Sequence, residues 1–154
     1  MTSQDSALDA WARLLRGHAT ITRALSAELV AQHGLTINDY DCLLHLSHAE
    51  DGRMRRVDLA DKLMLTASGV TRLLDGLEEA GLVERASCAS DRRVVYAVMT
   101  DDGRARLERA SESHLAGIRR FLEERFSEEE LDQLAELLGR LPEAAEASGQ
   151  DCAA

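Results

Sequence analysis

Short polar side chains and an arginine share one face of a segment that begins at Thr66, a helix N-cap, and ends at the helix stop Gly81. Ser68, Thr71 and Arg72 lie opposite a leucine-rich stripe, where a surface helix usually carries Glu and Lys. Hydroxyl groups suit hydrogen bonds to phosphates or base edges, and a guanidinium can bind a phosphate or pair bidentately with guanine O6 and N7. This face is therefore suited to close contact with duplex DNA.

Two further arginines, Arg92 and Arg93, stand at the predicted tip of a β-hairpin. The flanking segments 82–85 and 94–99 are rich in β-branched side chains, and the turn-like segment 88–91 lies between them. Arginines at such a tip can enter the narrow, electronegative minor groove. For either arginine alone, simple exposure to solvent explains its position as well as DNA contact does. Their joint position after the polar helix favours DNA binding.

Three helices are predicted before that polar helix. Apolar residues at helical spacing indicate a long helix over 6–33, which Gly34 ends. Thr36 caps a second helix that runs to the turn at 51–52, and a short third helix spans 57–64. Helix, short turn, polar helix and hairpin is the order of a winged helix-turn-helix.

Two more helices follow the hairpin. Thr100 caps one that continues to about Phe126, with acidic residues in its first turn, where the helix dipole favours negative charge. Ser127 begins a last helix whose leucine stripe ends near Pro142, and the tail 144–154 is predicted to fray. We expect a mostly α fold with a small β-hairpin wing, in which N- and C-terminal dimerisation helices flank the winged helix-turn-helix.

Composition and charge exclude other classes of protein. The net charge is −10, but the acidic residues gather towards the two ends and leave a near-neutral middle with clustered arginines. No apolar run is long enough to span a membrane, and the first residues do not resemble a signal peptide, so we expect a cytoplasmic protein without membrane contact. Phosphate loops and hydrolase motifs are absent, so we expect neither an enzyme nor a cofactor.

Cysteines and histidines give weaker signals for metal or redox chemistry. Cys42, His45 and His48 recur every three residues on the second helix, a spacing that drifts around the helix and rarely converges on one zinc ion. Ordinary packing is favoured, with Cys42 buried and inert. Cys88 beside the hairpin could be exposed and reactive, although a structural role is favoured. With Cys152 the cysteines are odd in number and form no CxxC pair.

The chain resembles the multiple antibiotic resistance regulator (MarR) family of bacterial and archaeal repressors. The resemblance covers nearly the whole sequence and is strongest at 59–63, 68–78, 81–83, 91–93, Thr100 and Gly103. The Asp-x-Arg element, here Asp91 to Arg93, is a specific mark of the family when it follows such a helix. Met99 departs from the family, which usually has Leu there, but this is a conservative packing change.

The resemblance implies a homodimer in which the first helix and the last two helices of each chain interleave. The chain would form a single domain over 1–154, with a winged helix-turn-helix at 36–100 and dimerisation helices at 5–34 and 101–146. The leucine stripes at both ends agree, because one small winged unit cannot bury them. Two-fold symmetry predicts a pseudo-palindromic, double-stranded DNA operator with half-sites about 34 Å apart. The predicted DNA-binding residues are Thr66, Ser68, Gly69, Thr71, Arg72, Asp91, Arg92 and Arg93.

The resemblance also implies release from DNA by a small-molecule effector, such as an aromatic or phenolic acid. Its pocket would lie between the dimerisation helices and the winged unit, lined by the first two helices. Trp11, His18 and Tyr40 are the candidate wall with polar handles, and Arg16 is the candidate partner of an anion. Alternatively, these four side chains are ordinary core, interface or solvated residues. For the function, one alternative is a regulator of the same fold that responds to a redox or metal signal. The other is a winged-helix protein-interaction module without DNA binding.

Overall fold

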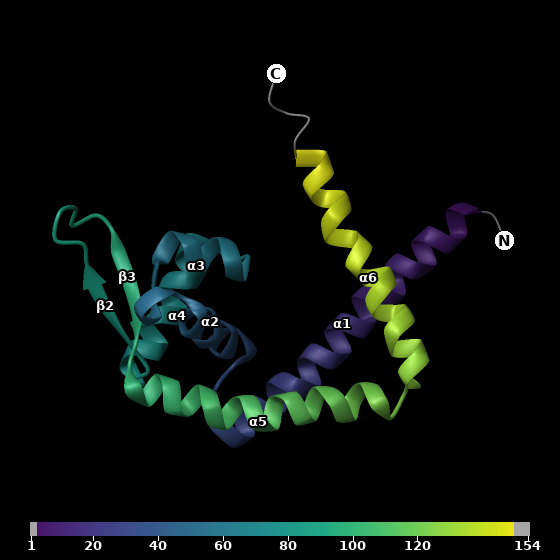
Figure 1. Cartoon of the computed structure of the whole chain (residues 1–154), viewed down its shortest axis with the longest axis horizontal. Helices are drawn as coiled ribbons and strands as arrows, with labels where there is room; N and C mark the ends of the chain where they lie inside the picture. The colour runs from purple at the N-terminus through teal and green to yellow at the C-terminus, as the bar shows by residue number, and fades with distance from the viewer. Residues whose placement is uncertain (1–2, 150–154) are drawn as a thin grey trace. The chain divides into compact units, whose positions relative to one another are not determined.

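The computed structural model describes residues 3–149 and divides into two compact units, Met1–Leu115 and Ala116–Ala154. It is mostly helical with one small antiparallel sheet, which confirms the predicted fold class (Figure 1). The elements in chain order are α1 (Ser3–His33), α2 (Ile37–His48), the 3-10 helix η1 (Glu50–Gly52), β1 (Arg53–Arg55), α3 (Arg56–Leu63), α4 (Ala67–Glu79), β2 (Val83–Ser87), β3 (Val95–Met99), α5 (Asp101–Glu123) and α6 (Glu128–Gly149).

The link between α1 and α2 follows the predicted stop and start signals. Gly34 has a φ of +66°, a left-handed conformation that glycine adopts without strain. Thr36 then caps α2: its Oγ accepts from the Asp39 backbone N–H at 3.2 Å, and the Asp39 carboxylate accepts from the Thr36 N–H at 2.8 Å. This reciprocal capping box fixes where α2 begins.

The turn between α3 and α4 is short and tightly bonded. Met64 ends α3 in a left-handed conformation, with a φ of +52°, and Thr66 caps α4. Leu59 of α3 and the apolar face of α4, which includes Val70 and Leu74, are fully buried together with α2 residues. The three helices share one core, so α4 turns its opposite face outward.

The sheet has three strands rather than the two that the sequence predicts. Its order is β1, β3, β2, all antiparallel, and Tyr96 of β3 pairs with Arg55 on one side and Ala86 on the other. β1 is three residues long and basic, so it lacks the alternating apolar pattern by which strands are recognised. The positive φ values of Asp51 and Gly52 turn the chain into this strand.

The start of α5 is bonded to the turn between α4 and β2. The Thr100 N–H donates to the Leu82 carbonyl at 3.1 Å, and the Thr100 Oγ donates to the Gly81 carbonyl at 2.7 Å. The same Oγ accepts from the Gly103 N–H at 3.0 Å, so the predicted cap is confirmed. A Cβ on Gly103 would stand 2.1 Å from the Leu82 oxygen, so only glycine fits here.

The last two helices begin where expected but end elsewhere. α5 ends at Glu123 rather than near Phe126, and α6 begins after a capping box between Ser127 and Glu130. α6 continues past Pro142 to Gly149, so residues 144–149 of the predicted frayed tail are helical. A proline removes only one backbone hydrogen bond, and the Ala- and Glu-rich residues after it have high helix propensity. The end of the tail, with Cys152, lies outside the described residues. No helix in the described range is long and apolar enough to cross a bilayer.

Candidate nucleic-acid interface

A short hydrogen-bond network holds the first turn of α4. The Thr66 Oγ accepts from the Gly69 N–H at 3.1 Å and lies 3.2 Å from the Ser68 Oγ. A Cβ on Gly69 would come within 3.1 Å of the Thr66 hydroxyl, so glycine permits this tight start. Within this arrangement, Thr66 and Gly69 shape the helix end from which the neighbouring side chains project.

A shallow hollow lies on the outward face of α4. Ala67, Ser68, Thr71 and Arg72 line it, and the Ser68 and Arg72 side chains are exposed. The Thr71 Oγ donates to the Ala67 carbonyl at 2.9 Å, and the hydroxyl oxygen can still accept hydrogen bonds. The hollow therefore combines small side chains, which allow close approach, with hydrogen-bonding groups and one guanidinium.

The wing ends in a loop that holds two arginines outward. The Cys88 N–H donates to the Val94 carbonyl at 3.1 Å, and the Val94 N–H donates to the Asp91 carbonyl at 3.1 Å. The Asp91 carboxylate accepts from the Arg93 backbone N–H at 2.9 Å. This aspartate therefore orders the loop, while Arg92 and Arg93 are exposed and form no ion pair with the side chains described at 5–141.

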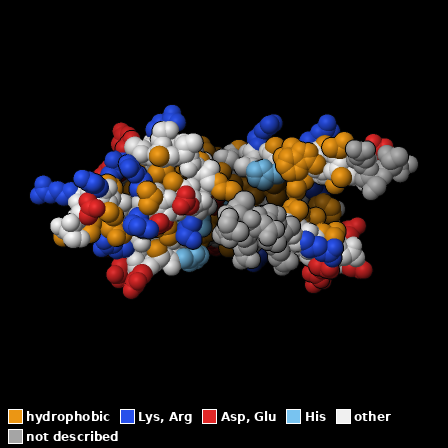
Figure 2. Space-filling view, turned by 90° about the horizontal axis from the view of Figure 1, so that it is seen from above, with side chains coloured by type: hydrophobic (Ala, Val, Ile, Leu, Met, Phe, Trp, Pro, Cys, Tyr) orange, Lys and Arg blue, Asp and Glu red, His pale blue; other side chains and the backbone are white. Residues whose placement is uncertain are grey.

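Figure 2 shows Lys and Arg side chains gathered at the wing end of the chain, with Asp and Glu side chains among them. Two arginines of α3 and β2, Arg56 and Arg85, were not among the predicted DNA-binding residues. Arg56 at the start of α3 brings Nη1 within 3.5 Å of the Thr71 Oγ, beside the hollow. Arg85 of β2 pairs with Asp75 and Glu78 of α4; their spacing of three residues places both carboxylates on one helix face, but it does not indicate a partner on β2.

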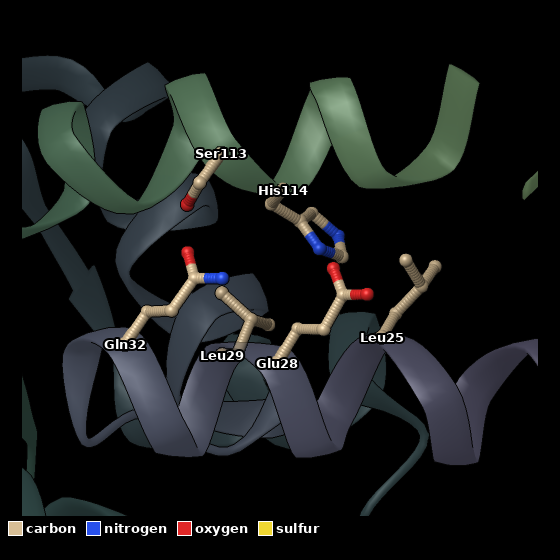
Figure 3. A pocket seen from close by; sticks show the side chains of 6 residues that line it. All are labelled: Leu25, Glu28, Leu29, Gln32, Ser113 and His114. Carbon is tan, nitrogen blue, oxygen red and sulfur yellow. The ribbon is translucent and has the colours of Figure 1, made fainter. Parts of the chain in front are cut away.

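A narrow pocket without room for a water molecule lies between α1 and α5 within the first unit. In Figure 3 the His114 ring points from α5 towards the α1 side chains opposite. Tyr40 of α2 is buried beside it, with ring centroids 4.6 Å apart and the Tyr40 hydroxyl 3.1 Å from the Ser111 Oγ. The pocket residues are Leu25, Glu28, Leu29, Gln32, Ser113 and His114.

The four candidate effector residues do not meet within one chain. Tyr40 is buried near the pocket, whereas Trp11, Arg16 and His18 are exposed on the N-terminal half of α1, and Trp11 keeps 59% of its surface open. Trp11 precedes the pocket residue Leu25 by 14 positions, which is about 21 Å along a helix. Any site that combines Trp11 with Tyr40 therefore needs a second chain.

The cysteines differ in their surroundings. Cys42 is fully buried, and burial raises the pKa of its thiol to about 12, so this thiol is protonated at neutral pH. Cys88 is half-buried at the wing, and hydrogen bonds from the Ser90 side chain and backbone lower the pKa of its thiol. No three His, Cys, Asp or Glu side chains of the described part are grouped so that they could hold a metal ion, and Cys42, His45 and His48 form no such group.

His114 is a buried imidazole with an unsatisfied nitrogen. It is 8% exposed, and its Nδ1 has no hydrogen-bond partner in the structure. Burial lowers the pKa of His114, and the nearby carboxylates of Asp41 and Glu28 offset part of that effect. Burial also raises the pKa of Asp41, against the opposing influence of His45 and His114. The neutral imidazole is therefore the form that this packing favours.

Comparison with known proteins gives the same family at the levels of sequence and structure. A family model described as MarR family matches residues 33–94. The HTH-type transcriptional repressor YetL of Bacillus subtilis is 34% identical over 111 residues, which cover 72% of this chain and 66% of YetL. AbsC, a MarR family transcriptional regulator of Streptomyces coelicolor, is 34% identical, with a TM-score of 0.80 over 97% of both chains. Sco3205, a MarR family regulator of the same organism, was solved in complex with DNA and is 25% identical, with a TM-score of 0.81 over 94% of this chain and 89% of Sco3205.

The buried His114 predicts a loss of stability in mild acid. Its folded pKa lies below the ordinary value of about 6.5 found in an unfolded chain. Its contribution to stability is therefore complete above that value and declines as the pH falls from it towards the lowered folded pKa. Urea unfolding at about pH 8 and about pH 5.5 should show a larger drop in unfolding free energy for the wild type than for His114→Gln. The exposed His48→Gln should keep the wild-type drop, and an equal drop in all three proteins would contradict the prediction.

Proposed function

The chain belongs to the MarR family of DNA-binding transcriptional regulators, and from that premise we propose a cytoplasmic, homodimeric repressor that a small-molecule effector releases from a pseudo-palindromic operator. The observation that carries the DNA contact is the pairing of two outward features on one core. α4 presents a small polar face, and the wing beside it presents Arg92 and Arg93 at a loop that its own hydrogen bonds hold closed. The MarR family regulator Sco3205, which is similar over most of this chain, was solved in complex with DNA.

In this proposal α4 enters the major groove. Ser68 and Thr71 bind phosphates or base edges, and Arg72 binds a phosphate or a guanine. Arg92 and Arg93 enter the neighbouring minor groove, where the negative potential is stronger. A net charge of −10 disfavours phosphate contact elsewhere on the chain, so binding is restricted to the face where arginines gather.

Exposed apolar side chains on α1 and α6 support the homodimer. Large apolar side chains stand out from both helices in the single chain, and water contact with so many is costly unless a partner covers them. In Figure 2 apolar side chains are exposed on the right, where α1 runs towards its N-terminus. The exposed residues are Leu8, Trp11, Leu14, Leu15 and Val30 on α1 and Leu137, Leu138 and Leu141 on α6.

For the effector we propose an anionic aromatic acid that binds beside Tyr40 and His114 once the narrow pocket between α1 and α5 has opened. Their rings offer stacking surfaces, and the unsatisfied Nδ1 of His114 offers a hydrogen bond. Trp11, Arg16 and His18 would be supplied by the α1 helix of the second chain. The effector releases DNA only through its difference in affinity for the two states, and a tenfold difference is worth about 1.4 kcal/mol per site.

The wing contact predicts a strong effect of removing its arginines. The double variant Arg92→Ala, Arg93→Ala should bind the DNA upstream of its own gene about tenfold or more weakly, since a lost charge-assisted contact costs about 1.4 kcal/mol or more. The slope of log K against log salt should shrink by roughly one for each lost phosphate contact. Arg109→Ala, which removes an exposed charge from α5, should change neither quantity. Unchanged affinity of the wing variant at matched salt would refute the contact and favour a protein-interaction module.

The dimer predicts that a charge on α6 separates the chains. Leu137 is 56% exposed in the single chain, so Leu137→Asp should leave the fold of each chain intact. Buried in an interface, the same carboxylate would cost several kcal/mol. Sedimentation at micromolar concentration should show a dimer for the wild type and for the control Gly139→Asp, which places the charge on the other side of α6. Leu137→Asp should give a monomer that no longer binds the operator. A wild-type monomer would rule the dimer out.

The effector site predicts a fluorescence change, because Trp11 is the only tryptophan. Titration with salicylate-like and cinnamate-like acids should quench Trp11 and release labelled operator DNA over the same concentration range. Arg16→Gln should weaken the response to the acids but leave that to a neutral phenol unchanged. If no acid acts while hydroperoxide releases DNA, the signal is redox chemistry at Cys88, whose lowered thiol pKa favours oxidation.

A further inference from the structure

One arginine ties the wing to the helix proposed to enter the major groove. Arg85 lies on β2, and its Nη2 pairs with Oδ1 of Asp75 while its Nε lies 3.2 Å from Oε2 of Glu78. The two carboxylates stand three residues apart on α4 and thus share one face of the helix. The planar guanidinium can hold both at once, which a lysine ammonium does less well. We call Arg85, Asp75 and Glu78 the wing clamp.

The wing clamp is placed where it can control the direction of the wing. β2 is buried at its first residue, Val83, and Arg85 lies two residues further out, opposite Ala97 of β3. Beyond it, β1 still pairs with the hairpin through Arg55 opposite Tyr96, and the hydrogen bonds of the loop 88–94 run within the loop. The clamp is therefore the side-chain contact nearest to the tip that joins the hairpin to α4 among the ion pairs of the described residues.

The length of the hairpin makes its direction important. A strand rises about 3.3 Å per residue, so the tip loop begins about 17 Å beyond Val83. A small tilt at the base therefore moves the tip arginines by several Å. Hydrogen bonds to DNA hold only over a few tenths of an Å around their usual 2.7–3.2 Å, so a tilted wing would miss its groove while α4 remained in its own.

We propose that Arg85 is a positioning residue for DNA binding, and that the wing clamp sets the angle between α4 and the wing so that Arg92 and Arg93 reach the groove beside α4. The proposal rests on the wing contact proposed above. Exposed ion pairs are individually weak, but a network centred on an arginine that is only 33% exposed has less conformational freedom to lose. The clamp determines the position of the wing tip relative to α4, and it contributes little to the free energy of unfolding.

A competing role for Arg85 is neutralisation of charge, since free carboxylates on α4 would repel phosphates. The two roles differ in what happens when both carboxylates are removed. Asp75→Asn with Glu78→Gln breaks the clamp and also removes two negative charges from the DNA-facing unit. Neutralisation predicts that this variant binds DNA as tightly as the wild type or more tightly. Positioning predicts weaker binding, because the wing arginines lose their place.

A double-mutant cycle tests the proposal through the coupling of the clamp to the tip. Binding to the upstream DNA is measured by fluorescence anisotropy at one salt concentration for the wild type, the clamp variant Asp75→Asn, Glu78→Gln, the tip variant Arg92→Ala, Arg93→Ala, and their combination. In the intact background the tip variant should lose about tenfold or more. In the clamp-free background the same change should cost about threefold or less, because the tip no longer makes its full contact. An equal loss in both backgrounds would overturn the positioning role.

Matched variants separate this coupling from charge and from folding. Glu79→Gln with Glu84→Gln removes the same charge from α4 and β2 without touching the clamp, and should show no coupling to the tip arginines. Arg85→Gln, which breaks the clamp from the wing side, should show the same lost coupling as the carboxylate variant. Melting temperatures near that of the wild type verify the fold of each variant.

If the tip variant binds normally with the clamp intact, the wing contact itself is wrong and the positioning role fails with it. If the tip matters equally in every background, only the role of Arg85 is wrong.

Discussion

Burial of the apolar face of α4 is the interaction on which the DNA face depends. Val70, Leu74 and Leu77 are buried against a core that α2 and Leu59 of α3 complete. A helix that buries one stripe must present the opposite one to solvent, so the small polar side chains face outward as a consequence of packing. The hydrogen-bonded start at Thr66 then fixes where that outward face begins.

The same core sets the base of the wing. Leu82 and Val83 are buried directly after α4, and β3 lies between β1 and β2 in the sheet. Helix α4 and the hairpin thus both project from one hydrophobic cluster. Local hydrogen bonds hold the start of α4 at Thr66 and the loop at the tip of the hairpin. A protein of net charge −10 needs such an arrangement, because its acidic side chains outnumber its basic ones. Contact with a polyanion is favourable only where basic side chains gather on one face.

Local signals in the sequence predicted the parts of this structure that local forces determine. Thr36, Thr66, Thr100 and Ser127 all cap helices as expected, because capping depends on a side chain and the next three backbone amides. β1 was missed because its pairing with β3 joins residues more than forty positions apart and leaves no periodic pattern in three residues. The helix over 144–149 was missed because these residues were judged by their place near the chain end, although the Ala and Glu residues there are strong helix formers.

The candidate site was predictable to the same extent. The outward residues of α4 and the tip arginines follow from amphipathic pattern and turn chemistry, whereas contacts between elements do not. That Arg85 would reach across to two carboxylates, or that Nδ1 of His114 would be buried between α1 and α5 without a partner, depends on how the elements pack. The effector candidates were chosen as side chains of suitable type, and type alone did not indicate that Tyr40 of α2 lies apart from the three candidates on α1.

The contact of Gly103 with the Leu82 carbonyl has a consequence for anyone who recombines regulators of this fold. The backbone of α5 touches the turn before β2 so closely that no Cβ fits, while Thr100 bonds to two carbonyls of the same turn. The turn, the hairpin and the first helical turn after it therefore form one interlocking piece, although Met99 and Thr100 look like a natural boundary between strand and helix. A wing transplanted from another protein must therefore include its own residues up to position 103. A junction between the hairpin and Gly103 would bring together a turn and a helix start from two proteins, whose packing surfaces need not fit.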